Sequence, residues 1–115
     1  MSYEERMTSL GLANQEDIRK SLNDKSTILL DVRTMDEIAA SGKIEVEGHP
    51  WMQTPCTPTS DDLDLDTDNV DKDAAVVLYC RSGRRASRAK EILENRGFKT
   101  VLNGGGYDDM KNMGL

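Results

Sequence analysis

The stretch that most constrains the fold of this chain runs from residue 75 to residue 97. It begins with the apolar run Ala-Val-Val-Leu-Tyr at 75–79 and reaches Cys80 directly afterwards. The polar loop that follows consists of Arg81, Ser82, Gly83, Arg84 and Arg85. A short apolar run is typical of a buried strand, and the spacing of the residues after the loop is typical of a helix that Gly97 ends. The sequence therefore predicts a buried strand that leads through a tight loop into a helix.

The loop after Cys80 has the features of an anion-binding site. Residues 80–96 hold six Lys or Arg against two Glu, a local net charge of +4 in a chain whose net charge is −6. A helix N-terminus adds free N–H groups and a partial positive charge. Gly83 lets the backbone turn so that successive N–H groups point inward. Because cysteine reacts as the thiolate, we interpret Cys80 as a nucleophile of lowered pKa that faces an anionic substrate. The alternative is a cysteine that packs as a small hydrophobic residue.

The rest of the chain alternates predicted strands and helices. In chain order we expect a short strand within 7–12, a helix at 14–23, a strand at 27–30, a helix at 34–41, an edge strand near 50–53, the strand at 75–79, the helix at 86–96, a strand at 98–102, a sharp turn at 103–106 and a helical turn at 107–113. Thr34 and Glu37 form a capping-box pattern at the start of the helix at 34–41. This alternation predicts an α/β fold, with a mostly parallel sheet of about five strands and helices on both faces. The length fits one domain, residues 1–115.

Asp31 and Arg33 follow the predicted strand at 27–30. In an open parallel sheet, ligands bind beyond the carboxyl ends of the strands. Asp31, Arg33 and Cys80 are therefore expected at the same edge of the sheet. The pattern leaves two interpretations open, a contribution to the site and a surface ion pair.

Cysteine usage and hydropathy bear on the compartment. Two cysteines, Cys56 and Cys80, do not make a disulfide framework, which favours a reducing compartment. Residues 1–6 contain no apolar signal-peptide segment, and no apolar run reaches membrane-spanning length. We expect a cytoplasmic protein without a membrane partner, with an organelle or the periplasm as open alternatives.

The negative charge is concentrated in one segment. Residues 61–73 contain seven Asp and one Lys, a net charge of −6, so the remainder is formally neutral. The only basic cluster surrounds Cys80, which argues against a nucleic-acid partner. A calcium loop of the EF-hand type needs Gly at its sixth position and Glu at its twelfth, where this run has Thr67 and Asp73. We therefore predict a solvated loop, with no metal and no cofactor.

Two further residues carry reactive side chains. Cys56 lies between Pro55 and Pro58, and we interpret it as an incidental loop cysteine, with a resolving thiol as the alternative. His49 is the only histidine, and its Pro-flanked setting favours a loop residue over a catalyst.

With these residues in hand, the chain resembles a single-domain rhodanese of the phage-shock-E kind. The matching segments are Leu-Leu-Asp-Val-Arg at 29–33 followed by Glu37, Val-Leu-Tyr-Cys-Arg-Ser-Gly-Arg-Arg-Ala-Ser at 77–87, Ala-Lys-Glu-Ile-Leu at 89–93, Gly-Phe at 97–98 and Val-Leu-Asn-Gly-Gly at 101–105. Together they span residues 27–106 in the family's order. The motif at Cys80 is the specific part, and the other segments support it.

The resemblance implies a rhodanese fold and a ping-pong sulfurtransferase. Cys80 would take the outer sulfur of thiosulfate as a persulfide and pass it to cyanide or to a thiol acceptor, for example a thioredoxin-like protein. Residues 81–85 would bind the anion through backbone N–H groups, and Arg81 and Arg85 through their charges. Asp31 and Arg33 match the family's Asp-Val-Arg. By this resemblance the two residues would support the loop. The chain departs from the family pattern between residues 42 and 57, which bears on the wall of the pocket that meets the acceptor.

Three other functions remain open at this point. Cysteine phosphatases and arsenate reductases also hold a tetrahedral oxyanion in a cysteine loop, but they space the residues as Cys-x5-Arg. Here Arg85 comes one position early, and residue 86 is Ala. Non-catalytic rhodanese-like modules often lack the cysteine that this chain keeps. A sulfur carrier for a protein partner, with thiosulfate only as a convenient donor, has the same sequence pattern as a free-standing enzyme.

Overall fold

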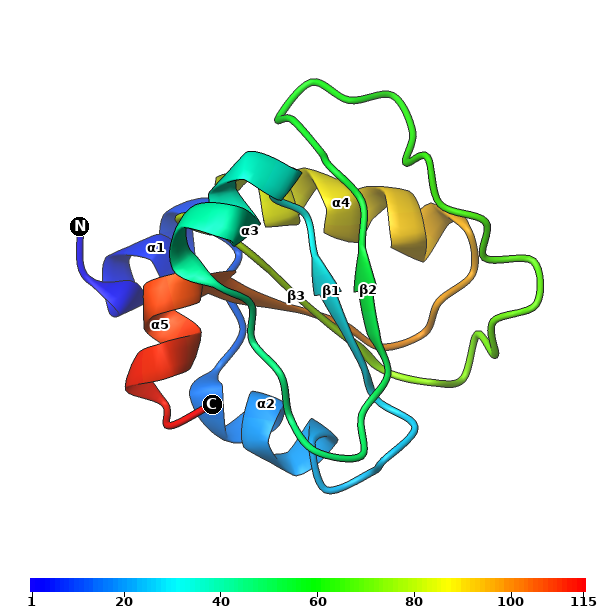
Figure 1. The fold of residues 1–115 in the computed structure, drawn as a ribbon, viewed down its shortest axis with the longest axis horizontal. Helices are drawn as coiled ribbons and strands as arrows, with labels where there is room; N and C mark the ends of the chain where they lie inside the picture. The colour runs from blue at the N-terminus through cyan, green and yellow to red at the C-terminus, as the bar shows by residue number, and fades with distance from the viewer.

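Four parallel strands form one sheet in the order β2-β1-β3-β4 in this computed structural model, which describes residues 1–115. In chain order the elements are α1 (Tyr3–Leu10), α2 (Gln15–Ser21), β1 (Ile28–Asp31), α3 (Met35–Ser41), β2 (Trp51–Gln53), β3 (Val76–Cys80), α4 (Arg84–Asn95), β4 (Val101–Gly106) and α5 (Tyr107–Asn112). Figure 1 shows α4 along one side of the sheet and α2 and α5 along the other. The predicted α/β fold with a parallel sheet and helices on both faces is confirmed.

The alternation of side chains along the strands creates two separate cores. Leu30 and Leu78 face α4 and pack with its buried residues, among them Leu93. Their neighbours Leu29 and Val77 point the other way, toward α2 and α5. Because successive strand residues point to opposite faces, a strand buried on both sides must be apolar throughout, as β3 is. Each fully buried side chain of this size stabilises the fold by about 1.5–3 kcal/mol.

The prediction of a strand within residues 7–12 is wrong, and the sheet has four strands, not about five. The N-terminal segment instead forms α1, because its caps are strong. The side chain of Ser2 accepts a hydrogen bond from the Glu5 N–H, and Glu5 accepts one from the Ser2 N–H, which makes a capping box. Gly11 ends the helix with a φ of 72°. These local hydrogen bonds outweigh the weak strand pattern of the same residues.

The last strand, β4, begins and ends later in the sequence than expected. A strand was predicted over 98–102, and β4 covers Val101–Gly106, so its last three residues are glycines. Glycine is unfavourable inside a strand unless another backbone approaches closely. At Gly104 the close neighbours are the side chain of Met110 and the carbonyl of Leu78. The structure thus uses as strand what the sequence pattern indicates as a turn.

The acidic segment is packed against α4 more than a solvated loop would be. Leu63 and Thr67 are buried. Arg96, just after α4, donates hydrogen bonds to the carbonyls of Leu63 and Leu65 and pairs with Asp62 at 2.8 Å. One arginine therefore ties the first part of the acidic run to the end of the helix, and in Figure 1 the long green loop between β2 and β3 passes the C-terminal end of α4.

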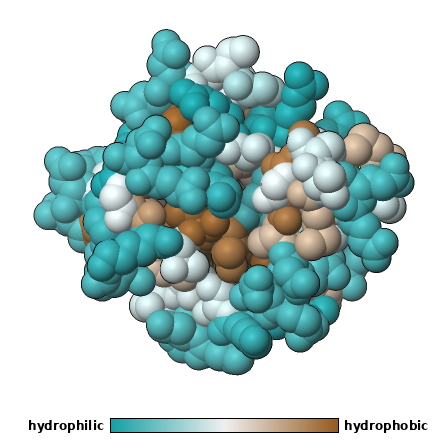
Figure 2. Space-filling model, turned by 180° about the vertical axis from the view of Figure 1, so that it is seen from behind, coloured by the Kyte–Doolittle hydropathy of each residue, from teal (hydrophilic) through white to brown (hydrophobic).

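The surface is mostly hydrophilic. On the face seen in Figure 2, apolar residues gather near the middle and polar residues surround them. None of the helices is both long enough and apolar enough to cross a bilayer.

Candidate active site

Cys80 is the last residue of β3 and is completely buried. Its Sγ accepts a hydrogen bond from the Gly83 N–H at 3.0 Å. The pairing of β3 with β4 shifts register between Leu78 and Cys80, so the strand is irregular where the cysteine stands. A reagent can reach Sγ only when neighbouring side chains move, because the residue has no exposed surface in this structure.

The loop at residues 80–85, which we call the Cys80 loop, turns directly into α4. Gly83 precedes the helix with a φ of 100°, and no side chain caps the helix there. A side chain on Gly83 would also lie 2.6 Å from the Leu12 side chain. Glycine is therefore required here for its conformation and for its size. The uncapped N-terminus leaves N–H groups that are suited to an anion.

The three arginines of the Cys80 loop differ in their contacts. Arg81 and Arg84 are exposed and have no hydrogen-bond or ion-pair partner. All six other arginines of the chain pair with a carboxylate or with backbone oxygens, or with both: Arg6, Arg19, Arg33, Arg85, Arg88 and Arg96. The two arginines without a partner thus lie within the Cys80 loop, on either side of Ser82 and Gly83.

Arg85 is held by Glu37 of α3. Its two terminal nitrogens donate to the two carboxylate oxygens at 2.6 and 2.8 Å. The hydrogen bond from Arg85 is the largest cause that lowers the pKa of Glu37 to about 2, and the Thr34 N–H adds to it. The same hydrogen bond raises the pKa of Arg85, with a further contribution from Cys80. The pair therefore stays charged and joins α3 to the start of α4.

Asp31 and Arg33 lie at the carboxyl edge of the sheet, as predicted. The two side chains are 0% and 3% exposed, and their closest N–O distance is 2.7 Å. Arg33 also donates to Ser41 Oγ at 2.6 Å and to the Gly42 carbonyl at 2.7 Å. A surface ion pair is therefore excluded. The buried pair ties the end of β1 to the end of α3, and it does not contact the Cys80 loop by a hydrogen bond.

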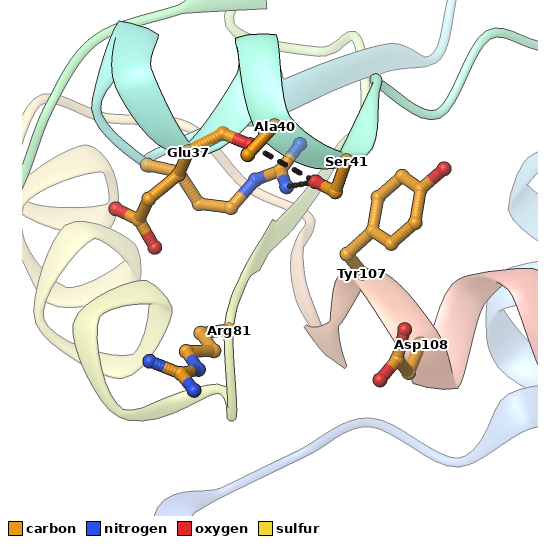
Figure 3. A pocket seen from close by; sticks show the side chains of 7 residues that line it. Glu37, Ala40, Ser41, Arg81, Tyr107 and Asp108 are labelled. Atoms are coloured by element: carbon orange, nitrogen blue, oxygen red, sulfur yellow. Dashed lines mark hydrogen bonds between the residues drawn. The ribbon is translucent and has the colours of Figure 1, made fainter.

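A hollow of about 320 Å³ opens beside the loop. Its lining residues come from the end of β1, from α3, from the Cys80 loop and from α5: Arg33, Glu37, Ala40, Ser41, Arg81, Tyr107 and Asp108. Figure 3 shows Arg81 and Asp108 across the hollow from α3. The hydrogen bond that Arg33 donates to Ser41 lies in the wall of this hollow. The hollow combines free positive charge with carboxylates and two hydroxyl groups.

The two other reactive side chains lie in different surroundings. Cys56 belongs to the same apolar cluster as Cys80, and burial is the main cause that raises the pKa of its thiol. His49 lies at the amino end of β1, where its ring nitrogens face the carbonyls of Thr27 and Leu22 at 2.9 and 3.0 Å. Cys80 lies at the carboxyl end of the sheet, so His49 is not part of this site.

Sequence reasoning missed several residues that contact the Cys80 loop or support it, among them Arg6, Asp109 and Glu37. Arg6 of α1 donates to the carbonyl of Ser82 at 2.8 Å. It also forms a two-pronged ion pair with Asp109 of α5. No local pattern indicates these contacts, because the pair is separated by 103 residues in sequence. Glu37 did carry a signal, because it follows Asp-Val-Arg in the segments that resemble the family, although it was not among the predicted site residues.

The chain matches the Rhodanese-like domain family over residues 14–113. It is 33% identical over 94 residues to a mitochondrial protein of Schizosaccharomyces pombe provisionally named a thiosulfate sulfurtransferase. That alignment covers 74% of this chain and 63% of the relative's length, so the chain spans less than two thirds of that relative. It is also 45% identical over 40 residues to the thiosulfate sulfurtransferase PspE of Escherichia coli, with 35% of this chain and 38% of that protein covered.

The fold has a solved counterpart in the human single-domain sulfurtransferase TSTD1. The TM-score is 0.60 at 18% sequence identity, and the match covers 88% of this chain and 95% of the human chain. At that identity the likeness concerns the fold alone. The element that the family match omits is α1, which ends before residue 14.

Proposed function

This chain belongs to the rhodanese-like domain family, and we propose that it is a sulfurtransferase that moves the outer sulfur of thiosulfate, through a persulfide on Cys80, to cyanide or to a thiol acceptor. The observation that carries this proposal is the setting of Sγ. The sulfur receives the Gly83 N–H at 3.0 Å and lies before the uncapped N-terminus of α4.

The proposed reaction has two half-reactions. The Cys80 thiolate attacks the outer sulfur of thiosulfate, the bond between the two sulfur atoms breaks, and sulfite leaves with the electron pair of that bond. The acceptor then attacks the outer sulfur of the persulfide, and the Cys80 thiolate leaves. With cyanide the product is thiocyanate, and with a thiol it is a new persulfide. A thioredoxin-like protein is one thiol acceptor of this kind.

The loop residues have distinct proposed roles. Thiosulfate is a dianion and sulfite leaves as an anion, so N–H groups and cations near Sγ stabilise every charged species on the path. We assign anion binding to the backbone of Ser82 and Gly83 and to the side chains of Arg81, Arg84 and Arg85. Arg81 and Arg84 are free for this task, whereas Arg85 has to share its nitrogens with Glu37.

Asp31 and Arg33 have a supporting role in this proposal. Their buried pair holds the end of α3, and α3 carries Glu37, which in turn holds Arg85. The pair therefore acts on the site through α3 and not by contact with a substrate.

Mass spectrometry of the intact protein tests the proposal. The reduced protein is mixed with thiosulfate, and its mass is read before and after cyanide is added. We expect a gain of one sulfur atom, about 32 Da, that maps to Cys80 and disappears with cyanide. The Cys80→Ser variant should show no gain. A folded, reduced protein that gains no sulfur contradicts the proposal, and turnover of an aryl phosphate by that protein would indicate cysteine phosphatase chemistry instead.

A further inference from the structure

One peptide unit links the sulfur of Cys80 to an arginine on the N-terminal helix. The Gly83 N–H of this unit donates to Cys80 Sγ at 3.0 Å. The Ser82 carbonyl of the same unit accepts from Arg6 Nη1 at 2.8 Å. In a trans peptide the N–H and the C=O point in opposite directions. A donor that fixes the carbonyl therefore fixes the direction of the N–H that meets the sulfur.

This peptide unit needs an external restraint. Gly83 has a φ of 100°, and a glycine rotates through both halves of backbone conformational space at little cost. A rotated unit would place the Ser82 carbonyl toward Sγ, where its negative end would repel a thiolate or an anionic substrate. Ser82 itself is exposed and its side chain makes no hydrogen bond.

Arg6 is well held for such a role. Its terminal nitrogens pair with the carboxylate of Asp109 at 2.7 and 2.6 Å, and both side chains are only 15% exposed. The hydrogen bond that Arg6 donates to Asp109 is the main cause that raises the pKa of Arg6, so the guanidinium stays charged. Asp109 in turn accepts from the Gly106 N–H at 2.7 Å. The chain of contacts runs from α5 through Arg6 to the Cys80 loop.

The next peptide unit of the loop is fixed from β4. The buried side chain of Asn103 donates to the Gly83 carbonyl at 2.8 Å. The side chain of Leu12, which follows α1, lies next to Gly83. Two neighbouring carbonyls thus have separate anchors, one in the N-terminal segment and one in the sheet.

We propose that Arg6 is a positioning residue of the active site: it orients the Ser82–Gly83 peptide so that its N–H faces Cys80 Sγ. A cation on the carbonyl also polarises the unit and strengthens its N–H as a donor. Because α1 lies outside the residues that match the rhodanese-like family, this function belongs to the part of the chain that the family does not supply. The inference rests on the proposed function for its effect on rate, but the orientation itself is independent of sulfur chemistry.

The test compares Arg6→Ala, Arg6→Lys and the wild type, with Arg19→Ala as the matched control. Arg19 also fastens a helix to the C-terminal region, through the Met113 carbonyl at 3.1 Å, but it does not contact the Cys80 loop. Two quantities are measured in folded proteins of matched thermal stability. The first is the rate of persulfide formation from thiosulfate. The second is the exchange rate of the Gly83 amide proton, measured by NMR.

We expect Arg6→Ala to slow persulfide formation about tenfold, the typical effect of losing one charge-assisted hydrogen bond, and to accelerate Gly83 exchange. Arg6→Lys should recover part of both, because an ammonium can reach the carbonyl but cannot bind Asp109 with two nitrogens. Arg19→Ala should match the wild type. If Arg6→Ala equals Arg19→Ala in both quantities, the inference is wrong. If the wild type forms no persulfide, the proposed function fails, and Gly83 exchange alone decides for or against the orienting role.

Discussion

Cys80 and Cys56 are both buried and both belong to one apolar cluster, and Cys80 ends β3 whereas Cys56 comes shortly after β2. Their surroundings are nevertheless opposite in kind. Cys80 Sγ accepts a backbone N–H, lies before a helix N-terminus and has Arg85 nearby. Cys56 Sγ faces the Thr57 carbonyl at 3.3 Å, and burial raises the pKa of its thiol. Burial alone does not distinguish a reactive cysteine from an inert one. The difference comes from whether the nearest dipoles present hydrogens or oxygens to the sulfur.

The largest effect should come from exchanging the sulfur atoms one at a time. Cys80→Ser is expected to lower thiocyanate formation by more than about a thousandfold, because the step needs the nucleophile itself. Cys56→Ala should keep the rate within about twofold of the wild type, since no step of the proposed reaction uses Cys56. Steady-state assays with thiosulfate and cyanide measure both. A large loss of thiocyanate formation in Cys56→Ala would indicate a resolving role for this thiol and would contradict the difference between the two cysteines.

The next effect concerns the arginine whose charge acts on each cysteine. Arg85 lies by Cys80, whereas Arg88, one turn further along α4, binds the Ser60 carbonyl at 2.6 Å and lowers the pKa of Cys56 as a minor contribution. Arg85→Ala should raise the KM for thiosulfate about tenfold if the residue only binds the anion, and should lower kcat if it also stabilises the transition state. Arg88→Ala is the matched control and should leave both constants unchanged. Equal kinetics in the two variants would remove Arg85 from the site.

A smaller effect should appear in the pH dependence of Cys56. Because burial raises the pKa of this thiol, its thiolate forms only at a pH above the ordinary value of about 8.5. In Cys80→Ser, where Cys56 is the only cysteine, alkylation by iodoacetamide should therefore keep rising with pH beyond that value. The unfolded protein provides the reference. A midpoint in the folded chain at or below that of the unfolded chain would contradict the prediction.

The smallest effect concerns Glu37, which holds Arg85, the arginine near Cys80. The pKa of Glu37 falls from 4.5 to about 2 on folding, so its ion pair contributes stability above pH 4.5 that is lost as the pH falls toward 2. Glu37→Gln should therefore be less stable than the wild type at neutral pH by about 1 kcal/mol, as expected for a partly exposed pair. The two proteins should converge near pH 2. Urea unfolding at several pH values measures this, and a difference that does not shrink with acid would assign the effect to packing.

Local sequence signals predicted most of the secondary structure. The strand–loop–helix at Cys80, the helix with the Thr34–Glu37 capping box and the buried strand at β1 were all expected, because caps and apolar runs act over a few residues. The same rules predicted a strand within residues 7–12 where the chain forms α1, because a weak apolar pattern competed with a capping box. The glycines of β4 were interpreted as a turn, since their partners lie far away in sequence.

The sequence by itself determined the sheet edge at which Asp31, Arg33 and Cys80 meet, because parallel strands bring their carboxyl ends together. Only the tertiary structure decided how the Cys80 loop is held. Arg85 bonds to Glu37 across 48 residues and Arg6 bonds to Ser82 across 76. Such pairs depend on how whole elements pack, and no periodicity or cap in the sequence encodes them. The residues on which the loop's chemistry depends are thus neighbours in sequence, whereas the loop's geometry is set by contacts from α1, α3, β4 and α5.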